Sequence, residues 1–398
     1  MRNPIRNYDW GSTSALAGLQ SRIPSGGPEA ELWMGAHPAA PSSLVVPTSV
    51  ASGGILPLPE AIARDPGAVL GADCIARFGP RLPFILKILA IAKPLSLQVH
   101  PDATRAEAQH RTDGGPYVDA FHKPELLYAL DHTEALFGFR PPAQVVSLLE
   151  HLRCERLADL AAGLAKDDGS DEPTRLHAAF AQLLRWPQEE RMSLVADLAS
   201  AITRLERAGN TDYPEVFGWI GRLVGLHPVD PMVLAPVLLD MVKLSPGDSV
   251  FVPAGVPHCY LSGLGVEIMA ASDNVLRSGL TSKAVHVDEL LQVVDTRPLA
   301  ADRATITQLS EFEQAWRIPV DDFQLTRIRI PPGRSVAASR IPGPQILLAI
   351  AGQVRVMSGG GAVELPTGTS AFVTAEAGPI ELALTGSGPG EIFRAAVG

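Results

Sequence analysis

Hydrophobic and polar positions divide the chain into stretches typical of strands and one stretch typical of helices. Residues 1 to about 140 carry short apolar runs separated by turn-forming Gly and Pro, which predicts mainly strands and loops. The apolar run 83–91 predicts a buried strand, and 95–99 predicts another one. Residues 58–64, with Pro59 near the start, are expected to form a short helix.

The pattern becomes helical at Pro142. Val145, Leu148 and Leu152 recur at helical spacing, and Leu176 and Phe180 begin a similar series after a polar break at 166–174. Further stripes of this kind continue to about residue 228. Such one-sided apolar stripes are more typical of a helical core than of a partner surface. We therefore expect a helical insert over 142–228.

The strand pattern returns near Val233. Residues 242–252 read as a strand, a turn at Pro246 and Gly247, and a second strand, and 288–294 predicts a helix. From about Thr305 the chain is again rich in strands, with candidates at 325–330, 346–350, 353–357, 371–374 and 380–384. The whole pattern predicts a mainly β protein with a helical insert and a small C-terminal sandwich or barrel.

Composition narrows the possible functions. A chain of 398 residues favours two or three domains, and its 46% hydrophobic content favours a packed core. The net charge of −10 argues against nucleic acid as a partner. No apolar run is long enough for a membrane helix, no signal peptide is evident, and the three cysteines form no CxxC pair. We expect a cytoplasmic protein with reduced thiols and no membrane partner.

Two segments carry the spacing of a metal site on strands. Gln98 and His100 are two residues apart, so on a strand both side chains face the same side. Gly247, Pro253, Gly255 and His258 fit the pattern G-x5-P-x-G-x2-H, which resembles the second motif of cupin barrels, although Ser262 replaces its final Asn. The usual partner motif H-x-H is altered here to Gln-Val-His at 98–100.

These segments, together with Glu125, offer an amide oxygen, two imidazoles and a carboxylate. A single histidine on a strand is more often a satisfied core residue than a ligand, but two in this context favour a metal. Nitrogen and oxygen ligands of this kind suit Zn²⁺, with an open position for water or substrate. Cys259 follows His258 directly and is expected to face away from the site.

An ordered series of motifs resembles the type I mannose-6-phosphate isomerases, also called phosphomannose isomerases. The series spans about residues 4 to 290, and its segments lie at 7–12 (NYDWGS), 31–38 (ELWMGAHP), 97–102 (LQVHPD), 122–125 (HKPE), 253–258 (PAGVPH) and 273–283 (DNVLRSGLTSK). The departure at Phe121, where related sequences often carry a polar residue, puts a local hydrogen bond in doubt.

The resemblance implies one Zn²⁺ per chain, held by Gln98, His100, Glu125 and His258. It implies reversible conversion of D-mannose 6-phosphate to D-fructose 6-phosphate, a step of carbohydrate metabolism. The implied architecture is a metal-bearing cupin (jelly-roll) barrel from 1–141 and 229–300, the α-helical domain 142–228, and a second jelly roll over 301–398. A small sugar phosphate is the expected partner, and a monomer is favoured.

Aldose–ketose isomerisation needs a base, a group that stabilises an oxyanion and a grip on phosphate. Arg277 offers a fixed bidentate cation, while Lys123, His122 and Glu267 are rival acid–base candidates. The candidates for the substrate phosphate are Ser96, Lys87 and Lys283. A lysine inside an apolar strand can also extend its amine to the surface, so both readings of Lys87 stay open.

Two other functions compete with the isomerase. An iron-dependent cupin oxygenase needs more open metal positions than four protein ligands leave. A non-catalytic sugar-phosphate sensor is disfavoured by Lys123, Glu267 and Arg277 beside the ligands. No His or Cys follows His286, so the C-terminal part is expected to be structural and to pack on the first barrel.

Overall fold

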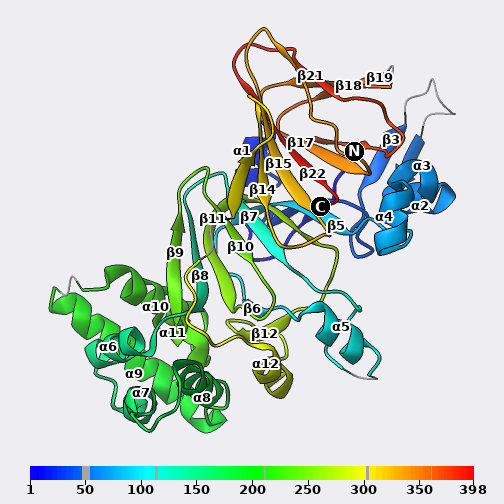
Figure 1. Ribbon diagram of the computed structural model, residues 1–398. Helices are drawn as coiled ribbons and strands as arrows, with labels where there is room; N and C mark the ends of the chain where they lie inside the picture. The colour runs from blue at the N-terminus through cyan, green and yellow to red at the C-terminus, as the bar shows by residue number, and fades with distance from the viewer. Residues whose placement is uncertain (47–53, 113–114, 210–211, 302–303, 360) are drawn as a thin grey trace.

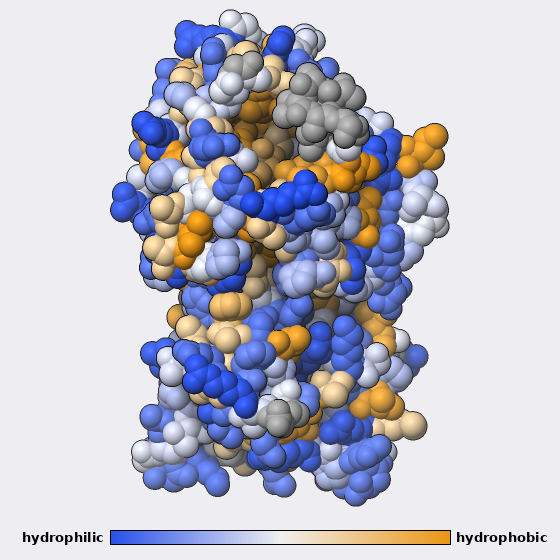
Figure 2. All heavy atoms as spheres, turned by 90° about the vertical axis from the view of Figure 1, so that its right-hand side faces the viewer, coloured by the Kyte–Doolittle hydropathy of each residue, from blue (hydrophilic) through white to orange (hydrophobic). Residues whose placement is uncertain are grey.

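The computed structural model describes residues 1–46, 54–112, 115–209, 212–301, 304–359 and 361–398. It is mainly β, with one group of helices at one end (Figure 1). A large sheet occupies the middle, and the C-terminal strands form the other end. Figure 2 shows a largely hydrophilic face on which hydrophobic residues appear in small groups. Within the described residues, no helix combines the length and hydrophobicity that crossing a membrane requires.

The central sheet has ten strands among the described residues, and its pairs are antiparallel. They are β1 (Ile5–Arg6), β2 (Glu31–Met34), β5 (Phe84–Ile91), β6 (Leu97–Val99), β7 (Glu125–Ala129), β8 (Thr133–Phe139), β9 (Leu239–Leu244), β10 (Ser249–Val252), β11 (His258–Ala270) and β12 (Leu276–Gly279). The strands predicted at 83–91 and 95–99 correspond to β5 and β6.

Strand β11 connects the parts of this sheet. Its second half pairs with β5 on one side and β7 on the other, while its first half pairs with β8 and, at His258, with β6. The change of partner occurs at Gly263, whose φ is +130° and where a Cβ would lie 2.3 Å from Thr133 Oγ1. Only glycine fits this close approach. This change of partner places the start of β11 beside β6, which in turn pairs with β12.

Short helices and one hairpin surround the first part of the sheet. They are α1 (Ala15–Leu19), α2 (Leu58–Arg64), α3 (Pro66–Leu70), α4 (Ala72–Phe78), α5 (Ala103–His110) and the hairpin β3 (Ser43–Val46) and β4 (Gly54–Pro57). The helix expected at 58–64 is α2, but α1, α3, α4 and α5 were not predicted. Asp65 and Asp102 cap α3 and α5 by accepting the backbone N–H groups of Ala68 and Arg105.

The helical segment follows β8. It contains α6 (Pro142–Leu152), a 3₁₀ turn (Glu155–Leu157), α7 (Ala158–Ala165), α8 (Glu172–Leu184), α9 (Gln188–Arg207) and α10 (Pro214–Leu226). The predicted apolar stripes form one buried cluster that also includes Val99 of β6. The stripes are therefore core, as the periodicity indicated.

The expectation that strands resume near Val233 is wrong. Residues Pro231–Leu234 form a 3₁₀ turn and Ala235–Leu238 form α11, so strands resume only at β9. Asp230 accepts the backbone N–H of Met232, and Pro231 occupies the first helical position. Short buried apolar runs do not distinguish helix from strand. The helix predicted at 288–294 is α12 (Val287–Val293).

The C-terminal strands form two sheets among the described residues. The six-stranded sheet contains β13 (Thr305–Gln308), β14 (Glu313–Arg317), β15 (Gln324–Ile330), β17 (Gln345–Ala351), β20 (Ser370–Val373) and β22 (Gly390–Ala396). The four-stranded sheet contains β16 (Ser335–Ala337), β18 (Val354–Ser358), β19 (Gly361–Leu365) and β21 (Glu381–Leu384).

The six-stranded sheet has two apolar faces. Ile392 of β22 lies in the core shared with the four-stranded sheet, while the next residue, Phe393, lies in a core shared with the central sheet. There the rings of Phe393 and Trp316 lie 4.7 Å and 5.3 Å from the ring of Tyr128, measured between centroids. Tyr128 belongs to β7, so this contact joins the C-terminal part to a strand that begins at Glu125.

Candidate metal centre

Three buried side chains from distant segments meet at one end of the central sheet. His100 follows β6, Glu125 is the first residue of β7 and His258 is the first residue of β11. Their ligand atoms all lie within 4.8 Å of one another. His100 Nε2 lies 3.2 Å from Glu125 Oε1, and His258 Nε2 lies 3.5 Å from Glu125 Oε2. Gln98 lies directly opposite His258 in the pairing of β6 with β11.

Hydrogen bonds fix which ring nitrogen of each imidazole carries the proton in the neutral form. His100 Nδ1 lies 3.2 Å from the Asn274 carbonyl, and His258 Nδ1 lies 3.0 Å from the Val256 carbonyl. A carbonyl only accepts, so each Nδ1 carries the proton and each Nε2 presents a lone pair. Burial lowers the pKa of His100 to about 4, which keeps its ring neutral at pH 7.

The arrangement fits a cation. His100 Nε2 is buried and makes no hydrogen bond with any described residue, although it faces a carboxylate oxygen. Burial opposes the charge of Glu125, but neighbouring positive charge, including that of Lys123, holds the pKa of its carboxyl well below the usual range. The nitrogen lone pairs repel the carboxylate oxygens that they face, unless a positive ion lies between them. Two nitrogens and a carboxylate oxygen are ligands that zinc prefers.

Cys259 does not take part in this cluster. Its thiol donates a hydrogen bond to the Leu95 carbonyl at 3.0 Å, and burial raises its pKa. The neutral thiol is therefore tied to the backbone, as expected for a residue next to a ligand on a strand.

A small cavity of about 70 Å³ adjoins the cluster. Its lining includes Glu31, Lys87, Ser96, Gln98, Lys123, Glu125, His258, Tyr260 and Glu267. Thus Ser96, Gln98, Lys123 and Glu267, which were chosen from the sequence, lie around one space. The Lys123 Nζ is 3.6 Å from Glu125 Oε1.

Lys87 lies buried between two carboxylates. Its Nζ is 3.2 Å from Glu267 Oε2 and 3.9 Å from Glu31 Oε2, and it lies 4.8 Å from the centroid of the Trp33 ring. Burial lowers the pKa of Lys87, but the charges of Glu31 and Glu267 outweigh this effect and raise it overall. The reading of Lys87 as a surface residue is therefore wrong, and its charge already has partners inside the protein.

Glu267 has an unusual proton affinity. Burial raises the pKa of Glu267 to about 7, against the opposing effect of Lys87. Tyr260 OH is also buried nearby and makes no hydrogen bond with the described residues. A carboxyl that titrates near neutral pH is able both to accept and to release a proton.

A wider cleft of about 750 Å³ also reaches Lys87, Gln98 and Lys123. Arg277 and Lys283 line it with Lys93, and aromatic residues Tyr8, Trp10 and Trp33 form part of its wall. Arg277 lies on β12 directly opposite Gln98 of β6. Several cations thus line a cleft of an otherwise acidic protein, which suits an anionic small molecule.

His122 lies apart from the other candidates. Its Nε2 lies 2.7 Å from Asp322 Oδ2, in the C-terminal part, and it lines neither the small cavity nor the cleft. Side chains alternate in this extended segment, so His122 points away from the site when Lys123 points into it. His122 thus lies outside the two spaces that the other catalytic candidates line, and its catalytic role stays a prediction.

The structure also brings in residues that were not chosen from the sequence. Glu31, Trp33 and His37 come from the segment 31–38, and Lys93 and Tyr260 complete the surroundings. Glu31 and Trp33 are two residues apart on a strand, which is the signal that places both on one face.

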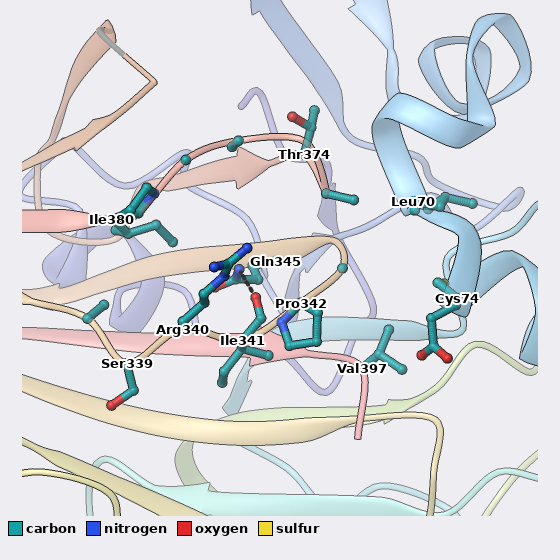
Figure 3. A pocket seen from close by; sticks show the side chains of 18 of the residues that line it. Leu70, Cys74, Ser339, Arg340, Ile341, Pro342, Gln345, Thr374, Ile380 and Val397 are labelled. Atoms are coloured by element: carbon teal, nitrogen blue, oxygen red, sulfur yellow. Dashed lines mark hydrogen bonds between the residues drawn. The ribbon is translucent and has the colours of Figure 1, made fainter.

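A separate cavity of about 340 Å³ lies between α3, α4 and the C-terminal strands. Figure 3 shows Leu70 and Cys74 on one side and Arg340, Ile341 and Gln345 on the other. None of the residues of the metal cluster lines it. It is therefore not part of the candidate metal centre.

Comparison with known proteins gives one family. The family model for phosphomannose isomerase type I, catalytic domain, matches residues 1–142. Mannose-6-phosphate isomerase of Escherichia coli (strain K12) is 35% identical over 98% of this chain and 97% of its own length. Mannose-6-phosphate isomerase 1 of Arabidopsis thaliana is 28% identical over 100% of this chain and 93% of its own length.

Solved structures agree with these relatives. A single-residue variant of phosphomannose isomerase from Salmonella typhimurium has a TM-score of 0.86 and 31% identity, covering 100% of this chain and 98% of its own. A mannose 6-phosphate isomerase bound with zinc and yttrium has a TM-score of 0.84 and 32% identity, with the same coverage. These matches, together with the site, define an enzyme of the isomerase class. The chain belongs to the type I phosphomannose isomerase family.

Proposed function

We propose that this protein interconverts D-mannose 6-phosphate and D-fructose 6-phosphate at a zinc site. The observation that carries the proposal is the buried group of His100, Glu125 and His258, in which two imidazole lone pairs face one carboxylate. The cationic cleft beside this group suits the phosphate of such a substrate.

Gln98, His100, Glu125 and His258 would hold the metal. Gln98 fits as the fourth ligand because it pairs with His258 and lines the same cavity. When bound, Zn²⁺ supplies a Lewis acid that polarises a carbonyl oxygen.

The reaction then needs a proton to move between the first two carbons of the sugar, through an enediol(ate). Glu267 and Lys123 are the acid–base groups that we propose, because both line the cavity next to the ligands. The raised pKa of Glu267, about 7, suits a group that takes a proton from one carbon and returns it to the next. Arg277 in the cleft offers two parallel N–H donors to developing negative charge.

We propose Ser96 and Lys283 for the substrate phosphate. Both line the cleft, whereas Lys87 is engaged by Glu31 and Glu267. We therefore assign Lys87 to holding these two carboxylates instead of to the phosphate.

Variants of the Salmonella enzyme support these assignments. One solved variant replaces a histidine. Two others replace a lysine and a glutamate that lie two positions apart, and two more replace a second glutamate and an arginine that lie ten positions apart. Lys123 and Glu125 have the same two-residue spacing here, and Glu267 and Arg277 the same ten-residue spacing.

We also propose the cupin architecture, with a jelly roll over 1–141 and 229–300, the helical domain 142–228 and a second jelly roll over 301–398. Strands on both sides of the helical segment join one sheet, which supports this division. A monomer is the expected state, and a native mass measurement tests it.

A coupled assay tests the function. Purified protein with zinc is expected to convert mannose 6-phosphate, to lose this activity with a chelator and to regain it when zinc is returned. Binding of mannose 6-phosphate without turnover by fully metallated protein would contradict the proposal and favour a sugar-phosphate sensor. Oxygen consumption would favour a different cupin enzyme.

A further inference from the structure

We propose that Asn274 is a positioning residue that holds His100 for the metal and ties it to the segment leading to Glu125. The inference rests on the proposed function, because it takes the cluster to bind a divalent cation. It concerns two stretches, residues 118–121 and 272–274, which we call the Asn274 clamp.

The backbone of Asn274 contacts a ligand directly. Asn274 lies in the loop between β11 and β12 and is fully buried. Its carbonyl accepts the hydrogen bond from His100 Nδ1 at 3.2 Å. The position of this carbonyl therefore sets both the tautomer and the orientation of the His100 ring.

The side chain of Asn274 fixes that carbonyl in place. Its Oδ1 accepts the backbone N–H groups of Val118 at 2.8 Å and Asp119 at 3.2 Å. Its Nδ2 donates to the carbonyls of Asp119 at 2.8 Å and Phe121 at 2.9 Å. Both ends of the carboxamide are thus occupied, which leaves this loop little freedom.

Asp119 closes the clamp from the other side. Its carboxylate accepts hydrogen bonds from Ser272 Oγ at 2.9 Å and from the Asp273 backbone N–H at 2.8 Å. The residues that follow, 122–125, lead directly to Glu125 at the start of β7. One network therefore acts on His100 through a hydrogen bond and on Glu125 through the chain.

The Asn274→Asp substitution keeps the shape of the side chain but replaces its N–H donor with an oxygen that accepts. The Asn274→Asp variant places an acceptor oxygen where Nδ2 now faces the carbonyls of Asp119 and Phe121 and Asp119 Oδ1. These acceptors repel it, so the two stretches separate and His100 loses its fixed hydrogen-bond acceptor. Loss of a group that hydrogen-bonds to a metal ligand typically weakens metal binding roughly 10- to 100-fold.

The experiment measures zinc release from the loaded full-length protein into excess chromogenic chelator. The Asn274→Asp variant is expected to release zinc roughly 10- to 100-fold faster than the unaltered protein. Asn3→Asp is the matched control, because Asn3 also bonds through both ends of its amide, to Ser42 and Ser370, outside the cluster. The control is expected to release zinc at the unaltered rate.

Ser272→Ala is a milder second variant. It removes the hydroxyl that donates to Asp119 and accepts the Asn274 backbone N–H, and we expect severalfold faster release. If Asn274→Asp does not fold, Ser272→Ala decides the question. Release at the unaltered rate from a folded Asn274→Asp or, failing that, from Ser272→Ala overturns the inference, even if the melting temperature falls. If the unaltered protein holds no zinc, it is the proposed function that fails.

Discussion

The buried ion pair between Glu313 and Arg394 allows a sharp test of how the C-terminal part is held together. Both side chains are fully buried, and Arg394 Nη2 lies 3.3 Å from Glu313 Oε2. Arg394 Nη1 also donates to the Ser339 carbonyl at 2.7 Å, while Glu313 Oε1 accepts the Ser339 N–H at 2.7 Å. Burial lowers the pKa of Arg394, against the opposing effect of Glu313.

Removing Glu313 leaves the charge of Arg394 buried without its counter-ion. Breaking a buried pair in this way typically costs about 3–5 kcal/mol of unfolding free energy. With an unfolding entropy of about 2.1 cal/mol/K per residue over 398 residues, each kcal/mol lowers the melting temperature by about 1.2 °C, so the Glu313→Ala variant is expected to melt roughly 4–6 °C lower. Replacing both partners, as in Glu313→Leu with Arg394→Met, removes both charges and is expected to recover most of this loss.

Urea unfolding of Glu313→Leu, Arg394→Met and the double variant that combines them, followed by circular dichroism, measures the coupling between the two residues. The reasoning is refuted if Glu313→Ala lies within about 1 kcal/mol of the unaltered protein, or if the double variant is less stable than both single variants. The ligands lie elsewhere, on the central sheet, so zinc content is expected to stay unchanged in every variant that folds.

Three further predictions concern the site. Glu267→Gln is expected to lower kcat by about 10²- to 10⁴-fold with zinc retained, because the amide does not exchange a proton; a kcat within tenfold would exclude Glu267 as the acid–base group. Lys87→Met removes the cation that lowers the pKa of Glu267, so the acid limb of the kcat–pH profile is expected to move to higher pH; a fixed or downward-moving limb contradicts this. His122→Ala removes the contact with Asp322, outside the cavity and the cleft, so kcat is expected to stay within about twofold; a loss resembling that of Glu267→Gln would support His122 as a catalytic residue.

The sequence located much of the fold through local patterns. The helical stripes beginning at Val145 and the buried strand at 83–91 were clear, because their periodicity reports directly which face is buried. At Pro231–Leu238 the strand expectation fails because a short apolar run has no period to distinguish helix from strand. The short helices α3 and α5 depend on single Asp caps, a weak signal inside a loop-rich region.

Motif spacing brought together the candidate ligands, but it did not reveal the charge network around them. Trp33 and Glu267 both lie directly opposite Lys87, from β2 and β11, and Glu31 lies two residues before Trp33. This grouping depends on the order of strands distant in the chain, which no local pattern encodes. The alternation that turns His122 outward was readable in principle, but it required knowing that the segment before Glu125 is extended.

Anomalous scattering at the zinc edge, from crystals of the zinc-loaded protein, tests the central claim most directly. We predict one strong peak per chain, bonded at about 2.0–2.2 Å to Gln98, His100 Nε2, Glu125 and His258 Nε2. A peak bound elsewhere, or none between these side chains in protein shown to contain zinc, would contradict the account.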